Sequence, residues 1–485
     1  MKGENRDKPG KQHIMKLFLF HIMEGLCMKK PFKYAISLIS IIALAGTLLV
    51  GCSGGNNKNA NEEAVLNIAT VNNNDMVIME EMTSEFTAKT GIKVNYTVLS
   101  ENEIRSKITQ DVGLGGGQYD LFTIGAQDSA VYLNNGWTEP LDGLLNGMSE
   151  EDKKNYDLED VFPVVRDSLS SESKGLGALP FYAETTLLFY NKEIFEAKNL
   201  TMPANPTWEQ VYELAVAAQD KDKGIAGIAL RGLPGSGQNM FIFSSIANAF
   251  GAQYYDMDWK ATFNTPEMKN AIEFYKKILA DAGQAGPTST GYTEALNLMS
   301  TGKAAMWYDA SVSAGTLANS KDSLVTGKIG YAMAPLQVKQ DATNTIGGWG
   351  IAINASSKKK EAAFQFLTWA TSKEYINLVG EKKGWESTPS GTRVSTYDNE
   401  NYKKASDFAD ITKEAILKVD FFNPSMNKTP YTGNSIPNMA EYSSWGEQIA
   451  QLLASYLVGQ KNIEAVLEEG QKILTDVAVA GEYAK

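Results

Sequence analysis

Histidine and cysteine are almost absent from this chain. Its 485 residues include two histidines, His13 and His21, and two cysteines, Cys27 and Cys52. All four lie within the first 52 residues, so the part that follows lacks the side chains required for Ser-His-Asp or Cys-His catalysis, for a histidine proton shuttle and for the usual zinc sites. Disulfide bonds are excluded as well, and the fold must be stabilised by its hydrophobic core.

Cys52 closes a segment with the order of a bacterial lipoprotein signal. Three lysines precede the apolar run Tyr34–Val50 of 17 residues, which ends at Gly51-Cys52. A basic start, a short apolar run and small residues at its end are the features of a cleaved signal peptide. An uncleaved transmembrane anchor is the alternative, but such an anchor needs about 20 apolar residues. We therefore predict a lipoprotein signal peptide at residues 28–51 and lipidation of Cys52.

The segments on either side of this signal are not expected to belong to the fold. Residues 1–27 carry a second short apolar stretch ahead of the basic one, which indicates a start site placed too early, with Met28 as the true start. Residues 52–63 are rich in glycine, asparagine and serine, which is typical of a flexible tether. The predicted location is extracytoplasmic, with the lipid on Cys52 anchoring the chain to the outer face of a bacterial cell membrane.

Acidic residues exceed basic ones in the rest of the chain. The whole chain has a formal net charge of −12, and residues 52–485 hold 37 basic and 54 acidic residues, a net charge of −17. Because nucleic acid binding relies on positive charge, nucleic acid is not an expected partner. The acidic surface suits an extracellular protein close to an anionic membrane and does not identify a substrate.

Hydrophobic spacing predicts alternating strands and helices after residue 64. The first expected strands are residues 65–71, 92–98 and 120–124. Asn74 or Asp75 is expected to cap the helix after the first strand, and Ser100 to Glu103 form a capping box for the next helix. This βαβαβ order is typical of a doubly wound α/β layer.

Later segments continue the α/β pattern. Thr207 to Gln210 form another capping box, and Thr265-Pro266 begin a further helix. Residues 304–308 and 350–353 are predicted strands. The glycine-rich stretch 232–237 lacks a following Lys-Ser/Thr and is not a phosphate loop. A chain of this length exceeds one ordinary domain, so two α/β lobes are expected.

Several stretches are similar to one family of binding proteins. Marks shared across that family are Asn135–Asp142, Leu179–Tyr182, Tyr190–Lys192 and Gly350–Asn354. More specific stretches are Ile68–Asn73 with Asp75-Met76, Arg231–Gly235 with Asn239-Met240, Ala305–Trp307 with Asp309-Ala310, and Pro389–Arg393. From Leu66 onward the chain resembles the extracellular solute-binding proteins of family 1, the sugar-capturing lipoproteins of ABC importers. Within that family it resembles the branch that binds alditols such as sorbitol and mannitol.

The resemblance implies an α/β fold of two lobes, the type II periplasmic-binding-protein or Venus-flytrap fold, with the ligand in the interlobe cleft. The first lobe would take residues 62–181 and 352–397, and the second would take residues 185–347 and 400–485. Hinge crossings would fall near residues 181–184 and 347–350, where glycines can absorb backbone rotation.

The resemblance and the chemistry of a polyhydroxylated ligand together suggest the site residues. Vicinal hydroxyls favour planar polar partners, and C–H faces favour aromatic rings. The ligand-binding candidates are Asn72, Asn73, Gln127, Tyr182, Glu184, Arg231, Asn239, Trp307, Asp309, Trp349 and Arg393. Some also have a structural interpretation: Trp307 and Trp349 as core residues, Glu184 and Asp309 as solvated caps, and Arg231 as a partner of Asp309. No catalytic residue, metal or cofactor is expected.

The chain departs from the alditol pattern at two places. Gln127-Asp128 stand where a bulkier aromatic-acidic pair is usual, and Ser236 stands where a tryptophan is common. The loss of an aromatic wall would enlarge the cleft. A cyclic monosaccharide or a disaccharide therefore stays open as the ligand.

The expected function is the capture of a sugar alcohol or sugar outside the cell by a monomer, followed by lobe closure and delivery to a pair of membrane permease subunits. Closure requires contacts between the ligand and both lobes, because only differential affinity shifts the population. A surface glycoside hydrolase is the main alternative, since its two carboxylates need no histidine. Glu184 and Asp309 would then lie about 5 Å apart across a glycosidic bond. A sensor subunit that presents sugar to a receptor kinase is a further alternative.

Overall fold

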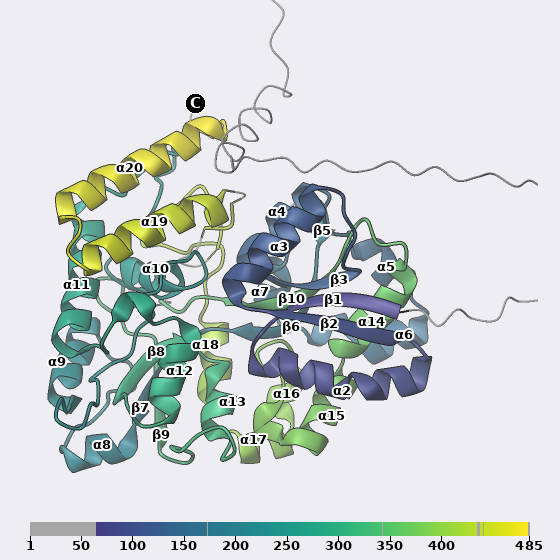
Figure 1. Ribbon diagram of the computed structural model, residues 1–485, viewed down its shortest axis with the longest axis horizontal. Coiled ribbons are helices and arrows are strands. Elements are labelled where there is room, and N and C mark those ends of the chain that lie inside the picture. Colours follow the sequence, from purple (N-terminus) through teal and green to yellow (C-terminus); the bar gives the residue numbers. More distant parts are fainter. Residues whose placement is uncertain (1–64, 172, 342, 434–436, 440, 484–485) are drawn as a thin grey trace, which may run out of the picture. The chain divides into compact units, whose positions relative to one another are not determined.

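Figure 1 shows the protein as a computed structural model, which describes residues 65–171, 173–341, 343–433, 437–439 and 441–483. The predicted signal peptide, the lipidation site at Cys52 and the tether lie outside these residues. Within them, no helix is both long enough and apolar enough to cross a membrane.

The first lobe is built on a mixed sheet of five strands, in the order β2-β1-β3-β10-β6. The strands are β1 (Val65–Val71), β2 (Lys93–Leu99), β3 (Leu121–Gly125), β6 (Leu179–Glu184) and β10 (Gly347–Ile353). β1 pairs in parallel with β2 and β3, whereas β10 pairs antiparallel with β3 and β6. The parallel pairs confirm the βαβαβ start predicted from the hydrophobic spacing.

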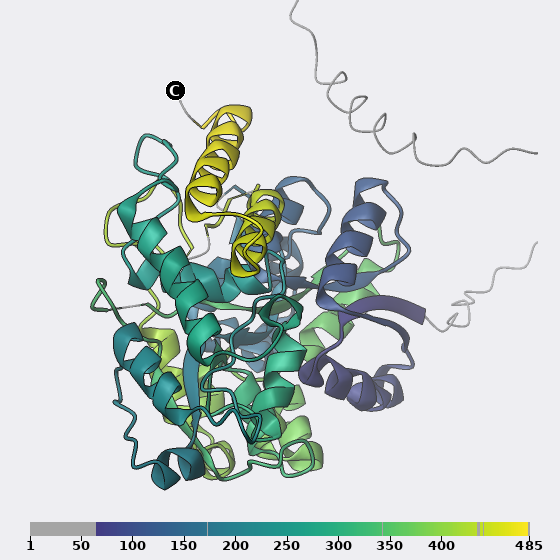
Figure 2. The ribbon, with the colours of Figure 1, turned by 60° about the vertical axis from the view of Figure 1, so that its left-hand side comes forward.

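Helices cover both faces of this sheet. In Figures 1 and 2, α3 and α4 lie on one face and α2 lies on the other. The helices of this part of the chain are α2 (Asn74–Thr90), α3 (Glu101–Gly113), α4 (Ala126–Asn134), α5 (Asp142–Asn146), α6 (Glu150–Tyr156), α7 (Pro163–Ser168), α14 (Lys360–Ala370) and α15 (Lys373–Lys383). Two short strands, β4 (Ser170–Ser171) and β5 (Gly175–Leu176), form a separate pair.

The residue that caps the start of helix α2 differs from the one we expected. Asn73, rather than Asn74 or Asp75, is the N-cap, because its Oδ1 accepts a hydrogen bond of 3.0 Å from the Met76 N–H. The helix ends at Gly91, which has a φ of 75° and therefore suits glycine. β1 thus passes into α2 through a polar turn at its carboxyl end.

Three other helix starts agree with the sequence. The capping box of Ser100 and Glu103 begins α3, the box that starts at Thr207 begins α9 (Trp208–Ala218), and Thr265 caps α11 (Pro266–Ala282). The strand expected at residues 304–308 lies slightly later, at β8 (Met306–Ala310).

The second lobe contains a three-stranded antiparallel sheet in the order β8-β7-β9. Its other strands are β7 (Thr186–Asn191) and β9 (Ile329–Met333). Successive side chains of a strand face opposite sides of the sheet. Leu188 and Tyr308 join a core with α9, α11 and the C-terminal helices, whereas Phe189 and Trp307 join a second core on the other side.

The remaining helices come from the connections of this second sheet and from the part of the chain after α15. They are α8 (Lys192–Ala197), α10 (Asn239–Ala249), α12 (Tyr292–Ser300), α13 (Ser313–Ala318), α16 (Val394–Asp398), α17 (Glu400–Ala405), α18 (Ala409–Leu417), α19 (Tyr442–Leu457) and α20 (Ile463–Ala480). In Figure 1, α19 and α20 run side by side at the edge of this lobe, and they are in direct contact.

The chain passes between the two sheets next to β6 and β10, which are neighbours in the first sheet. β6 leads through Thr185 directly into β7, and the chain is back in the first sheet from Gly347 onward. Gly348 has a φ of 120°, and a Cβ there would lie 2.4 Å from the carbonyl oxygen of Tyr182, so only glycine fits. Because β10 begins at Gly347, the chain returns to the first sheet earlier than residue 352, where we expected the first lobe to resume. The lobe boundaries themselves stay a prediction.

Candidate functional site

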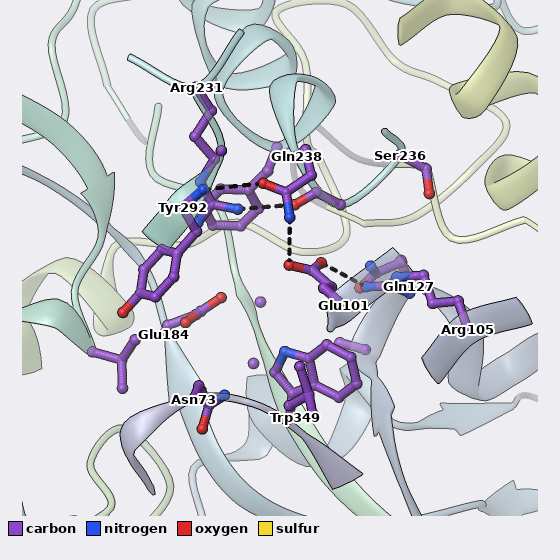
Figure 3. A pocket seen from close by; sticks show the side chains of 18 of the residues that line it. Asn73, Glu101, Arg105, Gln127, Glu184, Arg231, Ser236, Gln238, Tyr292 and Trp349 are labelled. Atoms are coloured by element: carbon purple, nitrogen blue, oxygen red, sulfur yellow. Dashed lines mark hydrogen bonds and ion pairs between the residues drawn. The ribbon is translucent and has the colours of Figure 1, made fainter. Parts of the chain in front are cut away.

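A polar cavity lies between the two lobes, at the carboxyl ends of the parallel strands. Its volume is about 280 Å³. In open α/β sheets a ligand site forms outside the carboxyl ends of the strands, where successive loops diverge. The side chains that line the cavity come from the ends of β1 and β6, the starts of α3, α4, α10 and α12, and strand β10 (Figure 3).

Seven of the eleven predicted site residues line this cavity. They are Asn72, Asn73, Gln127, Tyr182, Glu184, Arg231 and Trp349. The other four, Asn239, Trp307, Asp309 and Arg393, do not line it. Whether each lining residue binds the ligand stays a prediction.

The first lobe contributes an amide, a hydroxyl and an indole. Asn73 Nδ2 donates a hydrogen bond of 2.8 Å to the Tyr182 hydroxyl, while its Oδ1 caps α2. The Tyr182 hydroxyl therefore accepts from Asn73 and can donate its own proton to a ligand. Trp349 is 7% exposed and provides a flat apolar surface, with the guanidinium of Arg105 above its ring at 5.2 Å. This wall combines hydrogen-bonding groups with an aromatic face.

A buried ion pair lies behind the wall of the second lobe. Arg231 Nε donates to both carboxylate oxygens of Asp309 at 3.1 and 2.9 Å, and its Nη2 donates to Oδ1 at 2.5 Å. Burial disfavours the charged form of Arg231, but the charge and hydrogen bonds of Asp309 outweigh this effect and raise its pKa. Asp309 also accepts hydrogen bonds from Trp307 Nε1 at 3.0 Å and from the Ala310 N–H at 2.7 Å. Asp309 is thus saturated within the protein and fully buried.

The guanidinium of Arg231 is held between two aromatic rings. It lies 4.9 Å from the centroid of Phe241 and 5.0 Å from that of Tyr292. Its Nη1 donates to the carbonyl oxygen of Gly237 at 2.9 Å. Arg231 therefore reaches the cavity as a neutralised, immobile group rather than as a free positive charge.

Glu184 lies at the last position of β6, next to the crossing between the sheets. It is 8% exposed and lines the cavity. Burial raises its pKa to about 8, the nearby Arg231 lowers it, and the charges of Asp309 and Glu101 raise it further. At neutral pH the carboxyl group is therefore mostly protonated and can both donate and accept hydrogen bonds.

The carboxylate pair of the hydrolase alternative is not assembled. Glu184 faces the cavity, but Asp309 is 0% exposed, is bonded on both oxygens and does not line the cavity. A retaining or inverting glycosidase needs both carboxyl groups beside the scissile bond. The geometry therefore supports binding rather than hydrolysis.

The remaining predicted residues have structural contacts. Asn239 accepts from the Gly235 N–H at 3.3 Å and donates to the carbonyl of Ala450 at 3.0 Å, which joins α10 to α19. Trp307 is fully buried and stacks on Phe189 with ring centroids 5.3 Å apart. Both side chains are thus directed into the second lobe.

Arg393 makes only contacts within the protein and does not line the cavity. It is 1% exposed, its Nε and Nη2 donate to the carbonyl of Thr371 at 3.1 and 3.0 Å, and its Nη1 donates to the carbonyl of Asp157 at 2.9 Å. Its guanidinium also lies 4.8 Å from the centroid of the Tyr156 ring. These contacts tie the segment after η3 (Trp385–Ser387) to α6 and α14.

Glu101, Arg105, Gln238 and Tyr292 are among the polar lining residues that sequence reasoning missed. Glu101 lies inside the capping box of α3, and we used that motif only to place the helix. The position itself carried a signal, because a helix that starts after a parallel strand starts at the ligand edge of the sheet. Gln238 and Tyr292 follow irregular loops, which gave no such signal.

The fold and the cavity together define a class of protein. Two α/β lobes enclose a polar cavity that offers amides, hydroxyls, a neutral carboxyl and an aromatic face, and this arrangement is that of a binding protein that closes on a small molecule. Residues 71–376 match the family described as bacterial extracellular solute-binding protein, and the chain belongs to this family. It is a binding protein rather than an enzyme.

Relatives and solved structures agree with this family. The mannitol-binding protein of Pseudomonas aeruginosa is 39% identical over 408 residues, which cover 84% of this chain and 91% of that protein. An ABC transporter solute-binding protein of Agrobacterium vitis, solved with bound D-mannitol, is 39% identical with a TM-score of 0.83 and covers 87% of this chain and 100% of its own. A solute-binding protein of Agrobacterium radiobacter, solved with ribitol, is 25% identical with a TM-score of 0.76, covering 85% and 98%. These matches confirm the resemblance found in the sequence and the two-lobed type II fold.

Proposed function

We propose that this protein is the solute-binding component of an ABC importer, which captures a sugar alcohol outside the cell and delivers it to the membrane permease. The observation that carries the proposal is the 39% identity, over 87% of this chain, to the structure solved with D-mannitol. The mannitol-binding relative of Pseudomonas aeruginosa supports the same ligand class. A linear hexitol is therefore the first candidate.

The chemistry of the cavity supports an uncharged ligand. The charges of Arg105 and Arg231 are satisfied by carboxylates of the protein, and Glu184 is mostly protonated at neutral pH. The cavity of about 280 Å³ lies at the lower limit of the roughly 300–1,000 Å³ of typical small-molecule sites. A compact neutral polyol fits both properties.

A thermal-shift screen of the chain from Asn61 onward tests the proposal. Ligands that bind only the native state raise Tm by mass action. We expect a shift with mannitol, sorbitol or arabitol, and none with mannitol 1-phosphate, which adds a charged phosphate group to the same carbon chain. A shift with glucose or maltose and none with alditols would overturn the alditol ligand, and no shift with any polyol or sugar would overturn the function.

A cyclic sugar is the second candidate, because Ser236 lines the cavity at a position where a tryptophan is common in the alditol pattern. A serine leaves room beside the start of α3 for a pyranose ring. Isothermal titration with mannitol and with fructose or glucose compares the two ligand shapes on the same protein. A lower Kd for the ring form would favour this candidate.

We further propose that the protein is a monomer anchored by a lipid on Cys52. The basic and apolar segments before Cys52 and the small residue Gly51 support this anchor. Metabolic labelling with a palmitate analogue in a bacterial host should mark the wild-type chain and the matched control Cys27→Ser, but not Cys52→Ser. Labelling of Cys52→Ser would exclude the anchor, and light scattering of the soluble chain checks the monomer.

A further inference from the structure

The two lobes are bonded to each other directly beside the cavity. Gln238, at the start of α10 in the second lobe, donates from Nε2 to Oε2 of Glu101 in the first lobe at 3.0 Å. Its Oε1 accepts a hydrogen bond of 3.1 Å from the N–H of Tyr292, so the orientation of the amide is fixed within its own lobe. Figure 3 shows this bridge crossing from the second lobe to Glu101.

Arg105 of α3 holds the acceptor of that bridge in place. Its Nη2 donates to Oε1 of Glu101 at 3.1 Å, and its Nη1 forms an ion pair with Oδ2 of Asp128. The amide oxygen of Gln127, in the orientation that satisfies both groups, also accepts from Arg105. The terminal nitrogens of Arg105 are thus occupied by groups of its own lobe.

Asp128 repeats the arrangement of Glu101. One oxygen of Asp128 pairs with Arg105, and the other accepts a hydrogen bond from the hydroxyl of Ser443, at the start of α19 in the second lobe. Each of the two carboxylates therefore binds Arg105 through one oxygen and the opposite lobe through the other. Ser443 does not line the cavity, so this second bridge is separate from the ligand site.

Gly237 allows the lobes to come this close. A Cβ at Gly237 would lie 2.2 Å from Oε1 of Glu101 and 2.9 Å from Nη2 of Arg105. The carbonyl of the same residue accepts from Arg231, which prevents the loop from turning away. Any side chain at position 237 must therefore displace the carboxylate of Glu101 and the guanidinium of Arg105 from the positions in which they meet the second lobe.

We propose that Arg105 is a positioning residue, which orients Glu101 and Asp128 so that Gln238 and Ser443 bond the second lobe directly. These two bridges form a latch that favours lobe closure whether or not a ligand is bound. The proposal rests on the proposed function for its effect on ligand affinity, but not for its effect on the ligand-free protein. Apparent affinity falls with the fraction of the protein in the competent state, so a weaker latch raises the apparent Kd.

Three variants weaken the latch, and one of them, Ser443→Ala, does so outside the cavity. Gly237→Ala introduces the clash, Ser443→Ala removes the bridge that lies outside the cavity, and Arg105→Lys keeps the charge but loses the fork that holds two carboxylates. The matched control is Gly143→Ala, because Gly143 is exposed and a Cβ there would meet nothing within 4 Å. All four are compared with wild type by X-ray scattering without ligand, by mannitol titration and by stopped-flow dissociation.

We expect Gly237→Ala and Arg105→Lys to enlarge the ligand-free radius of gyration and to weaken mannitol binding about tenfold. Ser443→Ala should raise the dissociation rate by a smaller factor, although it touches no ligand. Gly143→Ala should match wild type. Unchanged scattering and unchanged dissociation in Gly237→Ala and Ser443→Ala would overturn the latch. If no polyol binds wild type, the proposed function fails, while the scattering comparison still decides the latch.

Discussion

Trp307 donates its indole N–H to the carboxylate of Asp309 over 3.0 Å, and both residues project from the same side of β8. The period of two along a strand brings their side chains together. The indole, the guanidinium of Arg231 and one backbone N–H thus surround a single buried carboxylate. Both residues that we expected in the cleft instead hold Arg231 at its edge.

Removal of this carboxylate should destabilise the second lobe. Asp309→Ala leaves the charge of Arg231 buried without a partner, and we expect a loss of about 3–5 kcal/mol in the free energy of unfolding. Urea denaturation measures the change. The matched control is Glu193→Ala, which breaks the solvated pair with Lys328 and should cost about 1 kcal/mol or less. Equal effects of the two variants would contradict a structural role for Asp309.

Replacement of Trp349 should affect binding. Trp349→Ala removes the flat apolar wall of the cavity, and we expect the Kd for mannitol to rise about tenfold or more. Trp137→Phe is the control, since Trp137 packs on Tyr132 at 5.2 Å and does not line the cavity. Titration calorimetry distinguishes the two, and an affinity loss in Trp137→Phe alone would refute this assignment.

Stability should depend on pH through two buried carboxyl groups. Burial raises the pKa of Glu184 to about 8 and that of Asp75 to about 7. A carboxyl group whose pKa is raised by folding stabilises the folded protein fully at pH values below its ordinary pKa. This stabilisation is lost as the pH rises through the raised pKa. The Tm of the ligand-free chain should therefore fall as the pH rises from about 4 to about 8, the interval between the ordinary and the raised pKa values.

The variants Glu184→Gln and Asp75→Asn test this dependence. Each amide keeps the size of the neutral acid but cannot ionise, so each variant should show a shallower fall of Tm over that range. Glu139→Gln is a suitable control because Glu139 pairs with Lys360, is only partly buried and does not line the cavity. A slope unchanged in both buried variants would exclude these groups as its cause.

Arg393 offers a variant that changes stability without changing affinity. Arg393→Met leaves the carbonyls of Thr371 and Asp157 without their donors, and we expect at least about 2 kcal/mol of destabilisation. The Kd for mannitol, measured below the unfolding transition, should equal that of wild type. Arg166→Met, which breaks a solvent-exposed pair with Glu159, serves as the control for loss of charge. A weaker affinity in a fully folded Arg393→Met would restore Arg393 to the site.

The sequence predicted local structure well wherever the signal was local. The capping boxes at Ser100 and Thr207 and the glycine stop at Gly91 depend on side chains within one turn, and all three are present. The cap of α2 was placed one or two residues too late, because three asparagines and an aspartate stand in a row and each of these side chains can cap a helix. Seven cavity residues followed from the resemblance together with the chemistry of a polyol.

The remaining site residues are placed by contacts between distant parts of the chain, and the spacing of residues along the sequence does not predict such contacts. Trp307 and Asp309 are on a strand with both faces buried, so alternation cannot say which face meets the cavity. Arg393 finds its acceptors on Thr371 and Asp157, which are distant in sequence. Gln238 meets Glu101 across 137 positions of the chain, and only the folded protein brings them together.

The hydrogen bond between Gln238 and Glu101 has a consequence for selectivity. A bond that forms on closure with any ligand multiplies the affinity for all of them by the same factor and leaves their ratios unchanged. Discrimination between one polyol and another then depends on the groups that line the cavity, such as Trp349, Tyr182 and Glu184. Strength of capture and choice of cargo can therefore change independently, through substitutions at different positions.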